Sequence, residues 1–126
     1  MGEFAEKPIM LVDDSSVNNM LMQNILEEAG YSTLSFSDPH DALIHLRKQQ
    51  PGLIILDIMM PGADGYEMLE YIKKSSETQG IPVIMLTARN NQRDRQRSFE
   101  LGAIDYITKP IDIDDVLARV TEAMKN

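Results

Sequence analysis

Residues 53–57 read LIILD, so four consecutive apolar residues end in an acid. A continuous apolar run, without the alternation of a half-exposed strand, predicts a strand that is covered on both faces, as in a parallel sheet. The same pattern recurs in residues 9–12 (IMLV) and 83–86 (VIML), and more weakly in residues 104–107 (IDYI). Residues 31–36, which are rich in Ser and Thr, are a fifth and less apolar candidate strand.

Stretches of helical periodicity separate these runs, and several of them begin or end at residues typical of helix caps. The five predicted helices run from Ser15 or Ser16 to near Gly30, from Asp38-Pro39 to Leu46, and over residues 65–74, 91–101 and 112–124. Five strands therefore alternate with five helices in a (βα)5 order. Right-handed crossovers turn this order into an α/β fold, a doubly wound five-stranded parallel sheet with helices on both faces.

The composition limits the functions that the chain can have. Its 126 residues suffice for one domain with a hydrophobic core. We expect residues 7–126 to form this domain and residues 1–6 to be an N-terminal extension or a remnant of cloning. The absence of cysteine excludes thiolate catalysis, Cys-ligated zinc and disulfides, and it fits a cytoplasmic location. A net charge of −8 should repel nucleic acid, and no apolar run approaches the ~20 residues that span a bilayer.

The helical patterns also predict which side chains face the core. The first helix is expected to carry four apolar side chains inward: Val17, Leu21, Ile25 and Leu26. Met20 and Met22 lie partly off this stripe and either fill gaps in the core or form an adaptable exposed surface. His40 and His45, on the second helix, are expected to be ordinary surface residues.

Residues able to do chemistry follow the predicted strands at the point where each strand ends. Asp13 and Asp14 follow the first strand, Asp57 the third, Thr87 the fourth and Lys109 the fifth. Because ligands of open α/β sheets bind at the carboxyl ends of the strands, we expect these side chains to form one site. Each of them alone has an ordinary explanation, such as a turn or a helix cap, so the prediction depends on their joint occurrence.

Three carboxylates in one site repel each other, and a divalent cation relieves that repulsion. Since the available ligands are oxygen atoms, Mg²⁺ is the expected ion, and protein-bound Mg²⁺ is often shared with a phosphate. The site therefore indicates phosphoryl chemistry. Asp57 is the expected nucleophile that becomes an aspartyl phosphate, and Asp14 with Asp13 is expected to hold Mg²⁺. Lys109 and Thr87 are expected to contact phosphoryl oxygens.

Over residues 7–124 the sequence resembles the receiver domains of bacterial two-component response regulators, the CheY-like domains. The acidic pair, the phosphoacceptor segment LDIMMPGADGYE (56–67), the Thr87-Ala88 pair and the Lys109-Pro110 pair all match the family pattern. The resemblance implies a flavodoxin-like strand order of 2-1-3-4-5. It also implies a signalling phosphoacceptor that catalyses its own phosphorylation and slow dephosphorylation, and not a metabolic enzyme.

The resemblance further implies the phosphodonor and several site residues. The donor would be a phosphohistidine on a sensor histidine kinase or on a histidine phosphotransfer protein, docked on the first helix. The main-chain carbonyl of Met59 would complete the protein ligands of Mg²⁺, and Met59 and Arg89 would tune the loss of the phosphoryl group. The Lys109–Pro110 peptide bond would be cis, and Gly65 would lie where the chain turns sharply into the third helix.

A conformational switch is the last implication of the resemblance. Thr87 would move toward a phosphoryl oxygen, Tyr106 would rotate inward, and the surface of the fourth helix, last strand and fifth helix would change. An aromatic side chain that is merely half-buried on an edge strand is the alternative for Tyr106. The output partner or domain stays open, as do a stand-alone receiver against a part of a longer regulator and a phosphorylation-dependent homodimer.

Other classes fit the sequence less well. A flavin binder would need a Ser/Thr/Gly-rich loop after the first strand, the P-loop motif is absent, and residues 57–67 lack EF-hand spacing. An aspartate-based phosphatase would need a carboxylate in place of Met59. A non-catalytic interaction module remains the alternative. The basic cluster Arg89, Arg93, Arg95 and Arg97 is either a surface for an output partner or a solvated helix face.

Overall fold

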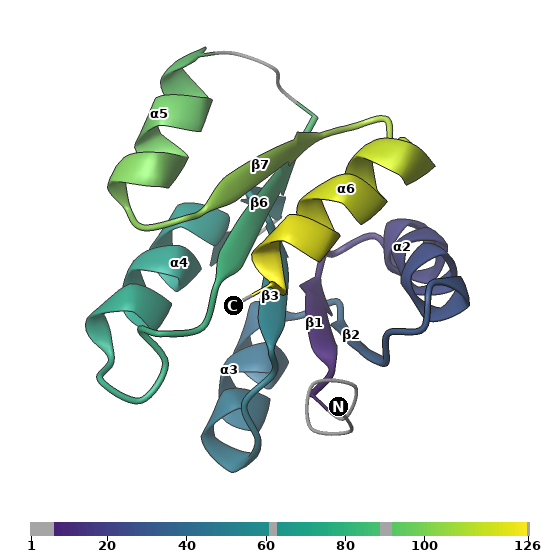
Figure 1. Ribbon diagram of the computed structural model, residues 1–126. Helices are drawn as coiled ribbons and strands as arrows, with labels where there is room; N and C mark the ends of the chain where they lie inside the picture. The colour runs from purple at the N-terminus through teal and green to yellow at the C-terminus, as the bar shows by residue number, and fades with distance from the viewer. Residues whose placement is uncertain (1–6, 61–62, 89–91, 126) are drawn as a thin grey trace.

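The computed structural model describes residues 7–60, 63–88 and 92–125, which form a parallel sheet flanked by helices (Figure 1). The sheet order is β2-β1-β3-β6-β7, and every neighbouring pair is parallel. Counted along the chain, these five strands have the predicted order 2-1-3-4-5. Their bounds are β1 (Ile9–Val12), β2 (Thr33–Phe36), β3 (Leu53–Asp57), β6 (Val83–Thr87) and β7 (Asp105–Thr108).

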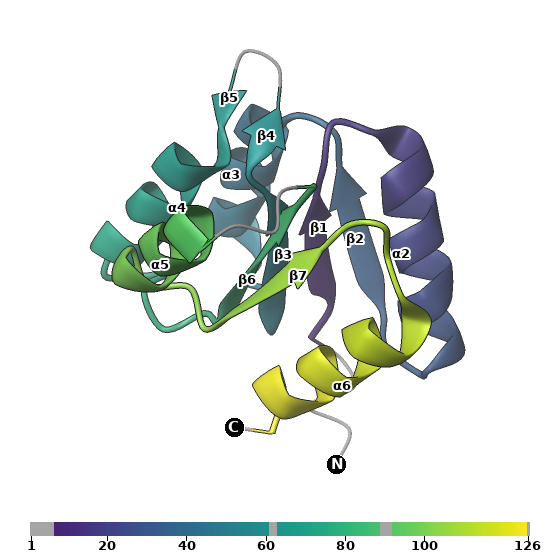
Figure 2. The ribbon, with the colours of Figure 1, turned by 90° about the horizontal axis from the view of Figure 1, so that it is seen from above.

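In the described part of the chain, five helices cover the sheet in two layers, with α2 and α6 on one face and α3, α4 and α5 on the other (Figure 2). The predicted helices are confirmed to within a few residues. Within the described residues, none of these helices has the length and apolarity to cross a membrane. Their bounds are α2 (Ser16–Glu28), α3 (Pro39–Lys48), α4 (Gly65–Lys74), α5 (Gln92–Glu100) and α6 (Ile113–Ala123).

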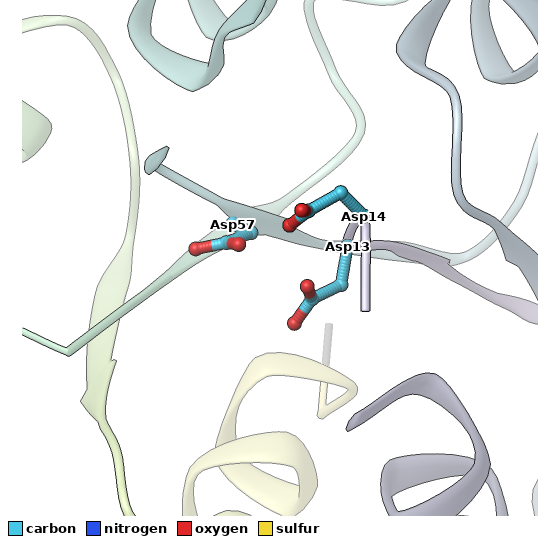
Figure 3. Close-up of side chains that lie close together, drawn as sticks. All are labelled: Asp13, Asp14 and Asp57. Atoms are coloured by element: carbon cyan, nitrogen blue, oxygen red, sulfur yellow. The ribbon is translucent and has the colours of Figure 1, made fainter. Parts of the chain in front are cut away.

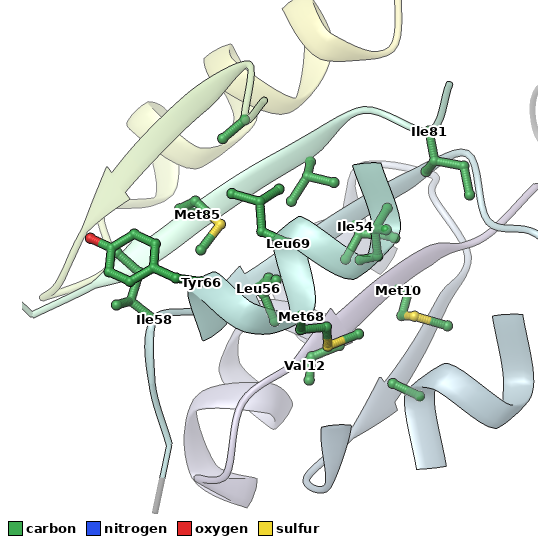
Figure 4. Packing of buried hydrophobic residues seen from close by; sticks show 14 of the residues in the cluster. Met10, Val12, Ile54, Leu56, Ile58, Tyr66, Met68, Leu69, Ile81 and Met85 are labelled. Atoms are coloured by element: carbon green, nitrogen blue, oxygen red, sulfur yellow. The ribbon is translucent and has the colours of Figure 1, made fainter. Parts of the chain in front are cut away.

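Two hydrophobic cores, one on each face of the sheet, explain the continuous apolar runs. Successive strand residues point to opposite faces, so Met10 and Val12 pack toward α3 and α4 whereas Ile9 and Leu11 pack toward α2 and α6. All four side chains are at most 2% exposed. Figure 4 shows part of the first core, in which residues of α4 lie across the strands. Burial on both faces fixes the sheet that carries the site.

Four of the helices begin after a residue whose side chain caps the first turn. Ser15 Oγ accepts a hydrogen bond from the Asn18 amide at 3.2 Å, which selects Ser15 over Ser16 as the cap of α2. The three remaining caps are aspartates that each accept a bond from an amide of the first turn: Asp38, Asp64 and Asp112. Gly102, which closes α5, has a φ of +110°, as expected for a helix-ending glycine.

The predicted inward face of α2 is wrong at two positions. Val17 is 73% exposed and Leu21 is 43% exposed, whereas Met22 is only 2% exposed. The buried stripe of α2 consists of Asn19, Met22, Ile25 and Leu26. The physical reason is that the Asn19 amide bonds main-chain carbonyls at the ends of two strands, which rotates Val17, Met20 and Leu21 toward solvent.

The two histidines of α3 differ in environment. His40 is exposed, as predicted, but His45 is half-buried, and its ring centroid lies 5.5 Å from that of Phe36. The prediction of a surface residue is therefore wrong for His45, because α3 turns it toward the edge strand β2.

A short antiparallel hairpin follows β3 and was not predicted. Its strands are β4 (Met59–Met60) and β5 (Ala63–Asp64), with Met59 opposite Asp64. Two-residue strands carry no periodicity that a sequence pattern could reveal. The hairpin leads the chain from Asp57 directly into α4.

Candidate functional site

Three carboxylates converge at the carboxyl edge of the sheet. One oxygen from each of Asp13, Asp14 and Asp57 lies within 4.8 Å of the other two, as Figure 3 shows for the side chains. Asp13 and Asp57 are each 2% exposed, while Asp14 is exposed to solvent. The parallel pairing of β1 with β3 places these chain segments side by side, so the predicted acidic site is assembled.

Lys109 supplies a positive charge to the two buried acids. Its Nζ lies 3.4 Å from Oδ2 of Asp13 and 3.6 Å from Oδ2 of Asp57. The Lys109 main-chain N–H donates to the carbonyl of Thr87 at 2.7 Å, which ties the end of β7 to the end of β6. The Lys109–Pro110 peptide bond is cis, as expected.

The Asp57 carboxyl is held in an environment that favours its protonated form. Burial is the main cause that raises its pKa to about 6, and the neighbouring Asp13 carboxylate acts in the same direction. The Lys109 ammonium and the Met59 main-chain N–H, 3.4 Å from Oδ1, act in the opposite direction. A second cation near Asp57 would therefore favour the ionised carboxylate that a nucleophile needs.

Asp13 provides the observation that fits a metal ion. Its Oδ1 accepts a hydrogen bond from the Ser15 amide at 3.0 Å. Its Oδ2 is buried and has no hydrogen-bond partner among the described residues, although Lys109 Nζ is 3.4 Å away. This buried oxygen, which accepts no hydrogen bond, forms with the two neighbouring carboxylates a donor set for a hard cation such as Mg²⁺. The residues present therefore fit the predicted ion.

The two predicted switch residues lie on neighbouring strands, Thr87 at the end of β6 and Tyr106 in β7. Both are buried, at 0% and 4% exposure. Burial and the Asp94 carboxylate raise the pKa of Tyr106, while hydrogen bonding with Thr87 lowers it. The Arg95 guanidinium lies 5.5 Å from the centre of the Tyr106 ring. The structure thus brings the two predicted switch residues into contact, with Tyr106 turned inward; its movement stays a prediction.

The basic residues of α5 are not only a solvated face. Arg97 lies over the ring of Tyr66, at 4.2 Å from its centre, and Arg95 lies over Tyr106 as described above. Arg93 is exposed. Arg89, predicted to tune dephosphorylation, falls outside the described residues.

Gly65 lies against the main chain of Asp57. An added Cβ at this glycine would be 2.2 Å from the Asp57 carbonyl oxygen and 2.7 Å from the Ile58 Cα. Its N–H donates to the Ile58 carbonyl at 2.9 Å. The reason for glycine here is therefore close backbone approach, since Gly65 is not among the residues with a positive φ.

Two further residues near the site were missed by the sequence analysis. Asn19 is 6% exposed and bonds the carbonyls of Asp13 and Phe36. Tyr66 donates its hydroxyl to Oδ1 of Asp94 at 3.0 Å and so joins α4 to α5. The sequence gives no signal for Asn19, because an apolar pattern leaves this polar residue off the predicted inward stripe of the helix.

Comparison with known proteins gives the family. Residues 9–121 match the family model described as the response regulator receiver domain. The chain belongs to the response regulator receiver family. It is 38% identical over 117 residues to the phosphate regulon transcriptional regulatory protein PhoB of Escherichia coli (strain K12), covering 93% of this chain and 51% of that protein. This receiver thus spans about half the length of that relative.

Solved structures share the receiver fold. A putative response regulator from Chloroflexus aurantiacus has a TM-score of 0.90 and 28% identity, covering 95% of this chain and 98% of that one. The Mn²⁺-bound form of response regulator Rcp1 has a TM-score of 0.77 and 32% identity, covering 92% of this chain and 90% of that one. The chain therefore has the receiver fold and an acidic pocket whose residues fit a phosphoacceptor.

Proposed function

We propose that this receiver accepts a phosphoryl group on Asp57 from the phosphohistidine of a sensor histidine kinase or of a histidine phosphotransfer protein. The observation that carries the proposal is the buried Asp57 carboxylate beside Lys109 and an acidic pair, in which Asp13 Oδ2 accepts no hydrogen bond from the described residues. Receiver domains accept phosphoryl groups from histidine kinases, and this chain matches their family model over most of its length.

Mg²⁺ is the proposed cofactor. Asp13, Asp14, Asp57 and the main-chain carbonyl of Met59 would hold it, and a bound ion would neutralise charge that develops on the phosphoryl oxygens. The Mn²⁺ in the Rcp1 structure supports a divalent ion in a relative of this chain. Mn²⁺ and Mg²⁺ both prefer oxygen ligands in octahedral geometry.

The transfer step follows from the groups around Asp57. A carboxylate oxygen of Asp57 attacks phosphorus, the bond from phosphorus to the donor imidazole breaks, and its electron pair stays on the imidazole nitrogen. Lys109 Nζ, already 3.6 Å from Asp57, would contact one phosphoryl oxygen. The Thr87 hydroxyl, at the end of the adjacent strand β6, would donate to another.

The proposed output is a population shift of α5, β7 and α6. Thr87 and Tyr106 already interact, so a Thr87 hydroxyl that turns to the phosphoryl group changes the contacts of the Tyr106 ring. The ring also touches Arg95 of α5, and this contact would pass the change to the helix surface. Slow self-dephosphorylation, tuned by Met59 and Arg89, is part of the same proposal.

The phosphodonor would dock on α2. Val17, Met20 and Leu21 are 43–73% exposed, and a groove of about 350 Å³ runs between α2 and α6, bordered by Leu21, Ile113 and Leu117. An apolar face of this kind suits a partner helix, and exposed Met suits an adaptable contact. We also propose a cytoplasmic location, an output domain or partner, and no direct nucleic-acid contact by this acidic domain, while pairing after phosphorylation stays an open point of the proposal.

The proposal is tested by intact-mass spectrometry after incubation with acetyl phosphate, with Mg²⁺ or with EDTA. Wild type should gain a single phosphoryl group only with Mg²⁺, and Asp57→Asn should gain none. Asp41→Asn removes an exposed acid of α3 and should behave as wild type. Uptake by Asp57→Asn at the wild-type rate, or no uptake by wild type with Mg²⁺, would contradict the proposal and favour a non-catalytic interaction module.

A further inference from the structure

Asn19 is a polar side chain in the buried stripe of α2. It is 6% exposed, between neighbours that are otherwise apolar on that stripe. Its Nδ2 donates one hydrogen bond to the carbonyl of Asp13 at 2.9 Å and another to the carbonyl of Phe36 at 3.2 Å. Phe36 ends β2, and Asp13 directly follows β1. One amide therefore joins α2 to the ends of two strands at the edge that carries the acids.

The contacts of Asp13 show what this amide achieves. The Asp13 N–H donates to the Phe36 carbonyl at 3.1 Å, its own carbonyl accepts from Asn19, and its Oδ1 accepts from the Ser15 amide at 3.0 Å. Only Oδ2 has no hydrogen bond within the described part of the chain, and this oxygen faces Lys109 at 3.4 Å. These three hydrogen bonds fix the direction in which Oδ2 of Asp13 points. Asn19 makes one of them and also bonds the Phe36 carbonyl that accepts another.

We propose that Asn19 is a positioning residue of the metal site. Its amide holds the main chain after β1 so that the carboxylates of Asp13 and Asp14 lie beside that of Asp57 before a metal ion arrives. Ligands that are already in place lose less freedom on binding, so the ion binds more tightly. The effect on Mg²⁺ affinity rests on the proposed function, whereas the ordering of the acidic segment is a property of the metal-free chain.

The test compares two variants that each lose a buried bond from a side chain to a carbonyl. Asn19→Leu keeps the approximate size of the side chain and removes both donors. Thr78→Val is the matched control, because Thr78 is also 6% exposed and its Oγ1 donates to the Ile72 carbonyl at 2.7 Å, between α4 and β6. Calorimetric titration gives the Kd for Mg²⁺, and hydrogen exchange of the metal-free proteins gives the order of the Asp13 and Ser15 amides.

Asn19→Leu should raise the Kd for Mg²⁺ about tenfold, at the lower end of the effect of outer-shell partners, and Thr78→Val should leave it unchanged. The Asp13 and Ser15 amides should exchange faster in Asn19→Leu than in Thr78→Val when both are compared at equal global stability. Equal Kd and equal exchange in the two variants would overturn the proposal.

The exchange rates of the metal-free proteins test the role of Asn19 even where Mg²⁺ binding cannot. If wild type binds no Mg²⁺, the proposed function fails, and the exchange rates of the two amides still decide whether Asn19 orders the acidic segment. If Asn19→Leu does not fold, Asn19→Gln retains the amide but displaces it by one methylene. It should show the same two effects, and wild-type values for both would overturn the inference.

Discussion

Gly65 and Asp57 are in direct main-chain contact: a Cβ on Gly65 would lie 2.2 Å from the carbonyl oxygen of Asp57. The main chain of the proposed phosphoacceptor therefore packs directly against the first residue of α4. The two nearest atoms, the Asp57 carbonyl oxygen and the Ile58 Cα, belong to the main chain, so no side-chain rotation can relieve the overlap. The position of the Asp57 carboxylate thus depends on the absence of a side chain eight residues further along the chain.

Gly65→Ala should destabilise the receiver and displace Asp57. The added methyl group forces the main chain at Asp57 or Ile58 to shift, with an expected loss of about 1–3 kcal/mol in the free energy of unfolding. Phosphoryl uptake from acetyl phosphate should also slow at temperatures where the variant is folded. Urea denaturation and intact-mass kinetics measure the two effects. Gly80→Ala is the matched control, since an added Cβ at Gly80 meets no atom within 4 Å.

Lys109→Met should slow phosphorylation of Asp57. The substitution removes the ammonium 3.6 Å from Asp57 Oδ2, so the pKa of Asp57 should rise further and a phosphoryl oxygen loses its cation. We expect a rate about 100-fold below wild type, as for the loss of one group that stabilises transition-state charge. Lys125→Met, which removes an exposed lysine paired with Glu122, is the control. Equal rates for the two variants would show that Lys109 has no part in transfer.

The raised pKa of Asp57 predicts a pH dependence of stability in the absence of metal. In the unfolded chain Asp57 titrates at its ordinary value of 3.8, and in the fold at about 6. Between these values the folded state binds more protons than the unfolded state, so this group's contribution to stability falls as the pH rises from about 4 to about 6. The carboxamide of the Asp57→Asn variant does not ionise, so the variant is free of this effect.

The stability advantage of Asp57→Asn over wild type should therefore grow by up to about 3 kcal/mol between pH 4 and pH 7. Urea denaturation of both proteins in EDTA, at several pH values, measures the difference, and contributions of other groups largely cancel. Added Mg²⁺ should reduce the difference at pH 7, because the ion favours the ionised carboxylate. A difference that stays constant would show that the pKa of Asp57 is unshifted in the fold, and one that shrinks with rising pH would show that it is lowered.

Tyr66→Phe should loosen α5. The Tyr66 hydroxyl donates to Asp94 at 3.0 Å. Burial is the main cause that raises the pKa of Tyr66 to about 12, and the hydrogen bond to Asp94 is the second. Loss of this bond to a charged acceptor should cost about 1–3 kcal/mol and speed hydrogen exchange of α5 amides. Tyr31→Phe removes a hydroxyl from a half-buried ring near α2 and should leave α5 unchanged. Unaltered exchange in α5 after Tyr66→Phe would mean that this contact does not hold the helix.

The sheet, and the edge of it that carries the acids, were predictable because strands buried on both faces have continuous apolar sequences. Continuous apolar runs identified the strands around Leu56 and Leu86, and the residues after them gave Asp57 and Thr87. Each strand end is local in sequence, and the parallel topology alone brings such ends together. The order of the strands and the main elements of the site therefore follow from short-range patterns.

Orientation within α2 was not predictable in this way. An apolar pattern places Val17 and Leu21 inward, yet both are exposed, and the polar Asn19 takes a buried position. The cause is a pair of hydrogen bonds to main-chain carbonyls that no pattern of side chains encodes. The same holds for Gly65, whose role depends on a distance between two backbones. Such contacts become visible only when the elements are packed.

Trapping the adduct shows whether Asp57 itself takes the phosphoryl group. After reaction with acetyl phosphate and Mg²⁺, borohydride reduction converts an aspartyl phosphate to homoserine, and peptide mass spectrometry locates that residue. Homoserine at position 57 alone, and none when Mg²⁺ is replaced by EDTA, is the predicted result. Homoserine at position 13 or 14, with Asp57 unmodified, would overturn the proposed function and assign the acceptor to the acidic pair.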